Sequence, residues 1–425
     1  MGLGRRVEPP DRDRSSRPQR PRPGHRLRSI GVDAASWMAA LPDHVHLDTL
    51  YLPGTHQSLA LNYPLASSLC QTTTLTAQLR GGIRCLDLRF SLIRDDKKGG
   101  GEPRLWAYHG PVPQGREMGE VFQELYEWLG SEEGKRETVI VSIKQENTGG
   151  HEFAALVWEL IDSTRPYLWY DQNVWPALGQ VRGRCVMFCR FGFESGRGLH
   201  PPIWPNDKPY PWRTEIGGRA TVVQDWYGVR SPLSIPDKAN LALSLFDSSS
   251  AAFSHSPTPE EDSTSATASA GMPRKADNDP PSVPFRINFL SCGTFPTLYP
   301  SHAAKGFGAP RFGIGYRGVN RLVLLGLERL DAMTERTTPR GSAQHLVIGA
   351  EDLQDALPPP PEAEEEKPPT TGGGDVAGGA LDRSQLAGGR QRREGQGGMM
   401  VFMDFWESPH PRKDSLVDRI IEMNF

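Results

Sequence analysis

The sequence predicts an α/β fold, a TIM-type (β/α)8 barrel that is irregular in places. Eight segments that favour strands consist mostly of continuous apolar runs, and such runs are typical of strands buried on both faces of a parallel sheet. Segments with helical periodicity lie between several of them, as expected when helices cover that sheet. A barrel of about 250 residues forms one domain, so a chain of 425 residues requires no second one.

We expect the eight strands at residues 46–53, 83–90, 105–109, 138–144, 184–191, 220–225, 285–290 and 399–405. We expect helices at residues 119–130, 152–164, 237–245 and 319–333. The first of these helices places Val121, Leu125 and Trp128 on one face, which suits packing on a sheet.

Three segments are too polar or too simple in composition to build a core. Residues 1–32 form a basic arm, residues 248–283 are rich in Ser, Thr, Ala and Pro, and residues 355–398 run from prolines through glutamates into glycines. We expect all three to be disordered, so the barrel spans residues 33–425 without the two insertions. Each insertion follows a helix and precedes a strand, which places it opposite the catalytic face of a barrel. The arm is either a solvated tail or attracts anionic lipid at roughly 1 kcal/mol per basic residue.

Charge and cysteine content exclude several classes of function. With a net charge of −3, the chain as a whole has no positive electrostatic field that would attract nucleic acid. The five cysteines are an odd number, lie mostly in apolar runs and favour buried free thiols. Cys185 and Cys189 have no second pair, so the sequence shows no metal cluster and implies no cofactor. No signal peptide, myristoylation site or membrane span is visible, and we expect a cytoplasmic or peripheral membrane protein.

The stretch Leu52-Pro-Gly-Thr-His-Gln-Ser58 presents His56 on a sharp turn after a strand, with Pro53 and Gly54 expected to make the turn. Such a histidine is placed for proton transfer or ligand binding. It is equally well explained as a turn histidine that satisfies local backbone groups.

A wider set of polar residues follows the strand candidates, at the ends where a barrel places its catalytic groups. The set contains His56, Asp87, Arg89, His109, Lys144, Arg190, Asp225, Tyr227 and Asp404. Two histidines can divide the general-base and general-acid roles, and arginine can bind a phosphoryl oxygen as charge develops. The set therefore indicates metal-free phosphodiester cleavage.

Three ordered motifs resemble the X region of phosphatidylinositol-specific phospholipase C in its bacterial-type, single-domain form. They are Leu52-Pro-Gly-Thr-His-Gln-Ser58, Gly82-Ile-Arg-Cys-Leu-Asp-Leu-Arg89 and Tyr108-His-Gly-Pro111. Segments 138–146, 223–227, 288–292, 318–320 and 401–404 continue the similarity in the same order, over most of residues 40–408.

The resemblance implies an imperfect TIM-type barrel that cleaves phosphatidylinositol to diacylglycerol and inositol 1,2-cyclic phosphate. It implies that His56 is the general base for the inositol 2-hydroxyl and that His109 protonates the leaving diacylglycerol oxygen. Arg89 would hold the phosphate, and Asp404 matches the carboxylate that orients the base.

The same resemblance assigns the head-group pocket. Lys144, Arg190, Asp225 and Tyr227 match residues that shape it, with Tyr227 stacking on the inositol ring. Asp87 matches a member of the hydrogen-bonded network near the phosphate. The expected partner is phosphatidylinositol or a related membrane phospholipid.

One residue departs from the family pattern. Where the bacterial motif usually has an aspartate that helps to orient the acid histidine, this chain has Gln57. An amide accepts a hydrogen bond but cannot stabilise an imidazolium by charge, so we expect a weaker general acid and a lower rate. Calcium-dependent relatives need several oxygen ligands around the cation. Here Arg89 occupies that region, so we expect a metal-independent reaction.

Two aromatic loops follow strands on the catalytic face, at residues 191–212 and 295–312. Their rings either contact a membrane surface or pack the loops onto the barrel. Two other functions stay open. The chain could be a catalytically weak or inactive barrel that binds inositol lipid, or a phosphodiesterase for another lipid head group.

Overall fold

The computed structural model describes residue 27 and residues 30–61, 66–94, 101–147, 150–192, 196–247, 283–309, 314–336, 397–408 and 415–425. Most of the three segments expected to be disordered lies outside these ranges. The arm and the second insertion each include a few residues that the structure describes. Leu27 is buried in the core, and Gly398 donates its backbone N–H to Asp48 and accepts from Arg286. Packed chain therefore extends into the arm and into the end of the second insertion.

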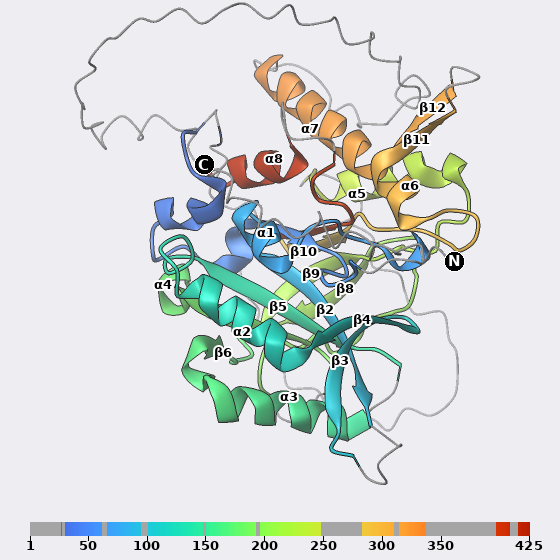
Figure 1. Cartoon of the computed structure of the whole chain (residues 1–425). Helices are drawn as coiled ribbons and strands as arrows, with labels where there is room; N and C mark the ends of the chain where they lie inside the picture. The colour runs from blue at the N-terminus through green and yellow to red at the C-terminus, as the bar shows by residue number, and fades with distance from the viewer. Residues whose placement is uncertain are drawn as a thin grey trace, which may run out of the picture.

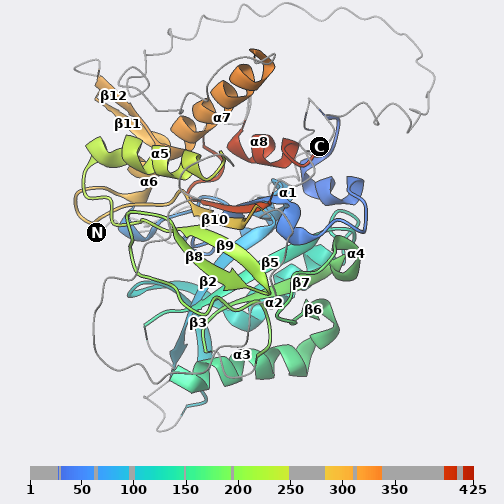
Figure 2. The ribbon, with the colours of Figure 1, turned by 180° about the vertical axis from the view of Figure 1, so that it is seen from behind.

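The central sheet is a curled, largely parallel half-barrel, seen from two sides in Figures 1 and 2. Its order is β6-β7-β5-β2-β1-β13-β10-β9-β8, and β1 pairs with β13, so the first and last strands lie side by side. The strands are β1 (Tyr51–Thr55), β2 (Cys85–Ile93), β5 (Thr138–Gln145), β6 (Trp169–Tyr170), β7 (Arg184–Arg190), β8 (Trp212–Ile216), β9 (Arg219–Gln224), β10 (Phe285–Phe289) and β13 (Met399–Met403). The irregular TIM-type fold is confirmed.

One expected barrel strand is antiparallel. The segment 105–109 forms β3 (Arg104–His109), which pairs with β2 and with β4 (Val112–Glu117) as an antiparallel ribbon. β2 pairs its outer half with β3, and Phe90 stands opposite Ala107. The chain thus returns along β2 and delivers His109 beside the site. Proximity of His109 to the other strand ends therefore comes from this ribbon and not from barrel geometry.

Helices surround the curled sheet. In the view of Figure 1, α2 (Met118–Leu129) and α3 (Gly150–Thr164) lie below it, and α5 (Ile235–Ser244), α7 (Val319–Arg336) and α8 (Leu416–Glu422) lie above it. Shorter helices are α1 (Leu75–Arg80), α4 (Leu178–Val181) and α6 (Pro300–Lys305), and β11 (Gly306–Ala309) pairs with β12 (Ile314–Arg317). The four expected helices are confirmed. Among the described residues, no helix is both long and apolar enough to span a bilayer.

The first strand ends later than expected. Residues 47–49 form a 3₁₀ helix, and Pro53 and Gly54 belong to β1 instead of making the turn. Gly54 is required there because a Cβ at this position would lie 2.8 Å from the Cβ of Cys85 on β2. The turn begins at His56, and Gln57 adopts a left-handed φ of 47°. This places the His56 side chain at the rim of the sheet.

The buried core follows the expected apolar strands, and all five cysteines are buried free thiols. A fully buried ion pair joins Arg84 to Glu137 at 2.7 Å, at the amino-terminal ends of β2 and β5. Glu137 also accepts hydrogen bonds from the backbone of Met38 and Ala39. This pair fixes the N-terminal segment to the end of the barrel that lies away from the catalytic residues.

Candidate active site

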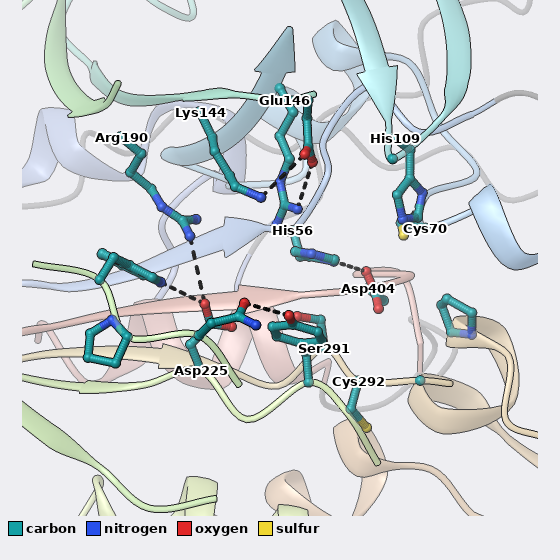
Figure 3. Close-up of a pocket in the computed structure, with 18 of the residues that line it drawn as sticks. His56, Cys70, His109, Lys144, Glu146, Arg190, Asp225, Ser291, Cys292 and Asp404 are labelled. Carbon is teal, nitrogen blue, oxygen red and sulfur yellow. Dashed lines mark hydrogen bonds and ion pairs between the residues drawn. The ribbon is translucent and has the colours of Figure 1, made fainter. Parts of the chain in front are cut away.

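A cavity of about 680 Å³ opens at the carboxyl ends of the parallel strands. Figure 3 shows side chains from several strands pointing into it. The cavity is lined by His56, Arg89, His109, Lys144, Arg190, Asp225, Tyr227 and Asp404. Asp87 and Gln57 are buried beside these residues. The fold therefore brings together the residues that the sequence places at separate strand ends, in a volume typical of small-molecule sites.

His56 and Asp404 form a close pair across the β1–β13 junction. The Nδ1 of His56 lies 2.7 Å from the Oδ1 of Asp404, which is buried. Gln71 holds both neighbouring loops, because its side-chain amide donates to the carbonyls of His56 and Met403 at 2.8 Å each. Asn320 donates to the carbonyl of Asp404 at 2.9 Å. Since the carboxylate accepts the Nδ1 proton, the Nε2 of His56 is left as the proton acceptor.

Arg89 is held between two carboxylates. Its Nε and Nη2 donate to the Oδ2 of Asp87 at 3.0 and 2.9 Å, and its Nη1 donates to Glu146 at 3.1 Å. Burial opposes ionisation of Asp87, but Arg89 and Arg190 together lower its pKa below the usual range. Burial likewise opposes the charge of Arg89, and Asp87 and Glu146 more than compensate, so the pKa of Arg89 is raised. The guanidinium is therefore charged and rigid at the base of the cavity.

Lys144 and Arg190 add two more cations along the same rim. The Lys144 ammonium lies 3.4 Å from Glu146, and burial lowers its pKa to about 8. Arg190 lies 3.7 Å from Asp225 and stacks 3.9 Å from the ring centroid of Trp204. Three cations lining one small cavity suit an anionic substrate.

Asp225 and Tyr227 lie on the loop after β9. The Oδ2 of Asp225 accepts a hydrogen bond from the Trp204 indole at 2.9 Å. The Tyr227 ring is 40% exposed, and its hydroxyl donates to Asn206 at 2.6 Å. Asp207 accepts from the backbone N–H of Tyr227 at 3.0 Å. The loop 200–212 therefore supports this side of the cavity, and an exposed Tyr227 face is suited to stacking on a sugar-like ring.

His109 stands across the cavity from Asp225. Its Nδ1 lies 3.0 Å from the backbone carbonyl of Ser68, so Nδ1 carries a proton and Nε2 is the reactive nitrogen. Burial lowers the pKa of His109. Gln57 directs its side-chain amide toward Glu146 at 3.5 Å and its backbone N–H toward Asp87 at 3.1 Å. His109 is thus oriented by the carbonyl of Ser68, whereas the residue at position 57, which was expected to orient it, contacts Glu146 and Asp87.

Three residues of the site were missed by sequence reasoning. Glu146 follows Lys144 by two positions, and the alternation of side chains along a strand was the available signal. Trp204 and Cys70 lie in loops and carry no periodic signal. Cys70 places its Sγ 3.9 Å from the Nδ1 of His109 and also lies beside His56 and Asp404.

The aromatic loops at residues 191–212 and 295–312 contain both buried and exposed side chains. Trp212 is buried and contacts Trp204, which in turn contacts Phe289. By contrast, Ile203 is 58% exposed and Phe295 is 69% exposed, and both line the mouth of the cavity. Phe193 and Phe312 lie outside the described residues.

No protein-family model matches the chain. The 1-phosphatidylinositol phosphodiesterase of Listeria monocytogenes is 27% identical over 207 residues, which cover 46% of this chain and 59% of that protein. The protein of the same name from Staphylococcus aureus strain Newman is 25% identical over 219 residues, covering 48% of this chain and 67% of that protein. The match to the Listeria relative thus spans less than two thirds of its length.

Solved structures share the fold. The phosphatidylinositol-specific phospholipase C of Staphylococcus aureus, in a form containing pentafluoro-phenylalanine, superposes with a TM-score of 0.53 and 16% identity over 94% of this chain and 100% of that chain. A double mutant of the same enzyme gives a TM-score of 0.55 and 17% identity, over 94% and 99%. The solved structures therefore show that the chain has the fold of a bacterial phosphatidylinositol-specific phospholipase C, and over about half of its length its sequence is similar to bacterial proteins named 1-phosphatidylinositol phosphodiesterase.

Proposed function

We propose that this protein cleaves phosphatidylinositol-type lipids to diacylglycerol and inositol 1,2-cyclic phosphate by metal-independent acid–base catalysis. The observation that carries the proposal is the arrangement of one cavity. The His56–Asp404 pair, the charged Arg89 and the reactive face of His109 all line it. The names of the relatives, which are phosphodiesterases of phosphatidylinositol, support the choice of substrate.

In the proposed reaction, the Nε2 of His56 removes the proton of the inositol 2-hydroxyl, and that oxygen attacks phosphorus. Arg89 donates to the phosphoryl oxygens as negative charge builds up on them. The bond from phosphorus to the diacylglycerol oxygen breaks, and His109 delivers a proton to that oxygen from its Nε2. Asp404 stabilises the imidazolium that forms on His56, at 2.7 Å.

The inositol head group is assigned to the side of the cavity that lies opposite His109. Lys144, Arg190 and Asp225 offer charged hydrogen-bonding groups to inositol hydroxyls, and Tyr227 offers its exposed ring face. Asp87 and Gln57 act indirectly, because Asp87 positions Arg89 and Gln57 contacts Glu146.

A membrane surface is the expected location of this substrate. Ile203 and Phe295 are exposed apolar side chains at the mouth of the cavity, where insertion among lipid head groups would align the cavity with its substrate. A solved structure of the Staphylococcus aureus enzyme concerns its membrane binding. We therefore infer peripheral membrane contact through this rim.

The decisive experiment measures cyclic inositol phosphate released from phosphatidylinositol vesicles. We expect turnover by the wild-type protein, a large loss in His56→Ala and His109→Ala, and unchanged activity when a chelator is added. Activity that survives both substitutions contradicts the mechanism. Chelator-sensitive activity contradicts metal independence.

Two other functions are distinguished by the same assay. An inositol-lipid-binding barrel without turnover is favoured by the lowered pKa of His109, because burial reduces the share of the protein in which His109 carries the proton that a general acid must donate. That function predicts vesicle binding that competes with free inositol phosphate but no released product. A different head group predicts cleavage of another phospholipid in parallel vesicle assays.

A further inference from the structure

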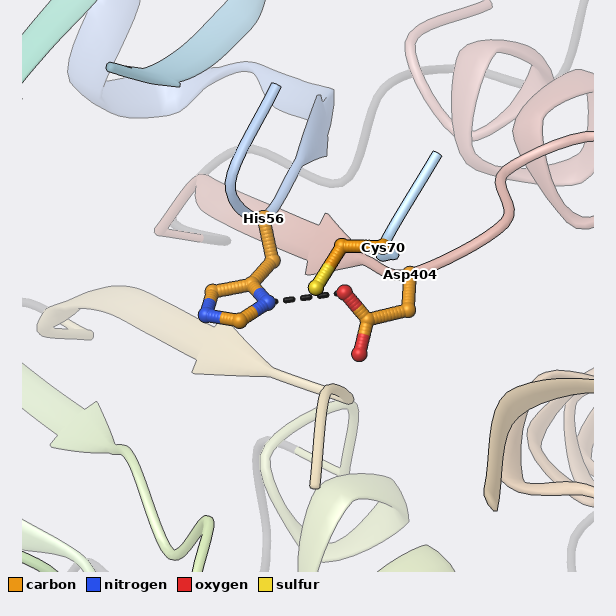
Figure 4. A group of neighbouring side chains, drawn as sticks. All are labelled: His56, Cys70 and Asp404. Carbon is orange, nitrogen blue, oxygen red and sulfur yellow. Dashed lines mark hydrogen bonds and ion pairs between the residues drawn. The ribbon is translucent and has the colours of Figure 1, made fainter. Parts of the chain in front are cut away.

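A thiol lies beside the proposed catalytic base, in a position that the phosphodiester reaction does not use. Figure 4 shows Cys70, His56 and Asp404 converging from three segments of the chain. One ligand atom of each residue lies within 4.8 Å of the other two. All three residues line the cavity, which lies at their side of the strand ends.

The donor set is that of a zinc site. Sulfur, imidazole nitrogen and carboxylate oxygen are the ligands that Zn²⁺ takes, and three protein ligands with an open fourth position are typical of zinc sites that also bind water or a small molecule. In a tetrahedral zinc site the ligand atoms stand roughly 3.3–3.7 Å apart. The Nδ1 of His56 and the Oδ1 of Asp404 are 2.7 Å apart, slightly closer than two zinc ligands, and the Cys70 sulfur lies within 4.8 Å of both. Side-chain movements of about 1 Å would therefore bring the three atoms to the separations of a tetrahedral site.

We propose that this cluster is an inhibitory binding site for thiophilic divalent cations such as Zn²⁺. The Cys70 thiol loses its proton to solvent and its sulfur bonds to the metal, and His56 and Asp404 provide the other two ligands. Ca²⁺ and Mg²⁺ prefer all-oxygen ligand sets and are not expected to bind there.

Occupation of this site conflicts with proton transfer by His56. The Nδ1 of His56 faces Asp404, so metal binding at Nδ1 displaces its proton and requires the tautomer that carries hydrogen on Nε2. That nitrogen then cannot accept the proton of a substrate hydroxyl. Inhibition as a consequence rests on the proposed function, whereas metal binding itself does not.

Cys70 and Asp404 are buried, and His56 is partly buried. Cys70 is also the one cysteine in the three-ligand group found among the described residues.

The site can be tested with Co²⁺ as a spectroscopic probe. We expect the wild-type protein to develop the near-ultraviolet charge-transfer absorption of a cobalt–thiolate bond, and Zn²⁺ to abolish it at one equivalent. Cys70→Ser and Cys70→Ala should lose the absorption. The matched control is Cys292→Ser, because Cys292 also lines the cavity but lies outside the cluster. Circular dichroism establishes that each variant is folded.

The inhibitory effect is measured as an inhibition constant for Zn²⁺, normalised to each variant's activity without metal. Cys70→Ser removes one protein ligand, and its inhibition constant for Zn²⁺ should be at least about tenfold higher than that of the wild type. Replacing even the residues that only hydrogen-bond to metal ligands typically lowers metal affinity about 10–100-fold. Equal inhibition of wild type and Cys70→Ser, or a cobalt–thiolate absorption that survives in Cys70→Ser, overturns the inference. If the protein cleaves no lipid, the cobalt titration still decides whether the site exists.

Discussion

Replacement of Asp404 by asparagine tests the central pair of the proposed mechanism. The amide retains an oxygen that can accept the Nδ1 proton of His56, and its shape is nearly that of the carboxylate. It removes the negative charge that stabilises the imidazolium in the transition state. With charge centres about 4 Å apart and an effective dielectric of about 20, that stabilisation is about 4 kcal/mol. The expected loss in kcat is therefore about 10³-fold.

The assay is initial-rate release of cyclic inositol phosphate from vesicles over a range of lipid concentrations. KM should change little, because the charge acts after substrate has bound. Asp43→Asn is the control, since Asp43 is an exposed carboxylate that also forms a 2.7 Å ion pair, with Arg182, far from the cavity. A decrease in kcat of less than about threefold for Asp404→Asn would refute the assignment of His56 as the base, because such a change corresponds to under about 1 kcal/mol.

Three further outcomes follow from the same structure. The pKa of Lys144 is about 8, so its positive charge is present below that pH and is lost above it; KM should rise as pH increases through about 8, and Lys144→Met should remove this rise. Glu137→Gln leaves the buried Arg84 without its counter-ion and should lower the free energy of unfolding in urea by about 3–5 kcal/mol, without altering KM. Gln57→Asp should raise kcat, because a carboxylate at position 57 would stabilise the protonated form of His109, the general acid. An unchanged or lower kcat would show that position 57 does not act on His109 and that burial of His109 limits the rate.

Much of the fold was predictable because the barrel repeats one local pattern. Continuous apolar runs such as 138–144 and 184–191 are buried on both faces, and they formed parallel strands. The segment 105–109 shows the limit of that reasoning. Its apolar residues look alike in a parallel or an antiparallel strand, and direction depends on the short connection of β2 to β3, which lies largely outside the described residues.

The candidate site was predictable where a polar residue ends an apolar strand, as at Asp225 and Asp404. Residues that reach the cavity from loops were not predictable in this way. Trp204 stacks on Arg190, and Cys70 enters the cluster from a segment after a 3₁₀ turn, because tertiary packing brings these loops over the strand ends. The local sequence around either residue contains no spacing that encodes such a contact.

The lowered pKa of His109 leads to a final prediction about substrate binding. A general acid must be protonated, so activity falls as pH rises through the pKa of His109, and burial lowers that pKa in the free protein. A bound phosphodiester adds a negative charge near the imidazole, which favours its protonated form. The alkaline limb of kcat/KM, which reports the free enzyme, should therefore lie at lower pH than the limb of kcat, which reports the complex. Coinciding limbs would show that bound phosphate does not restore the proton, and His109 would then be no general acid.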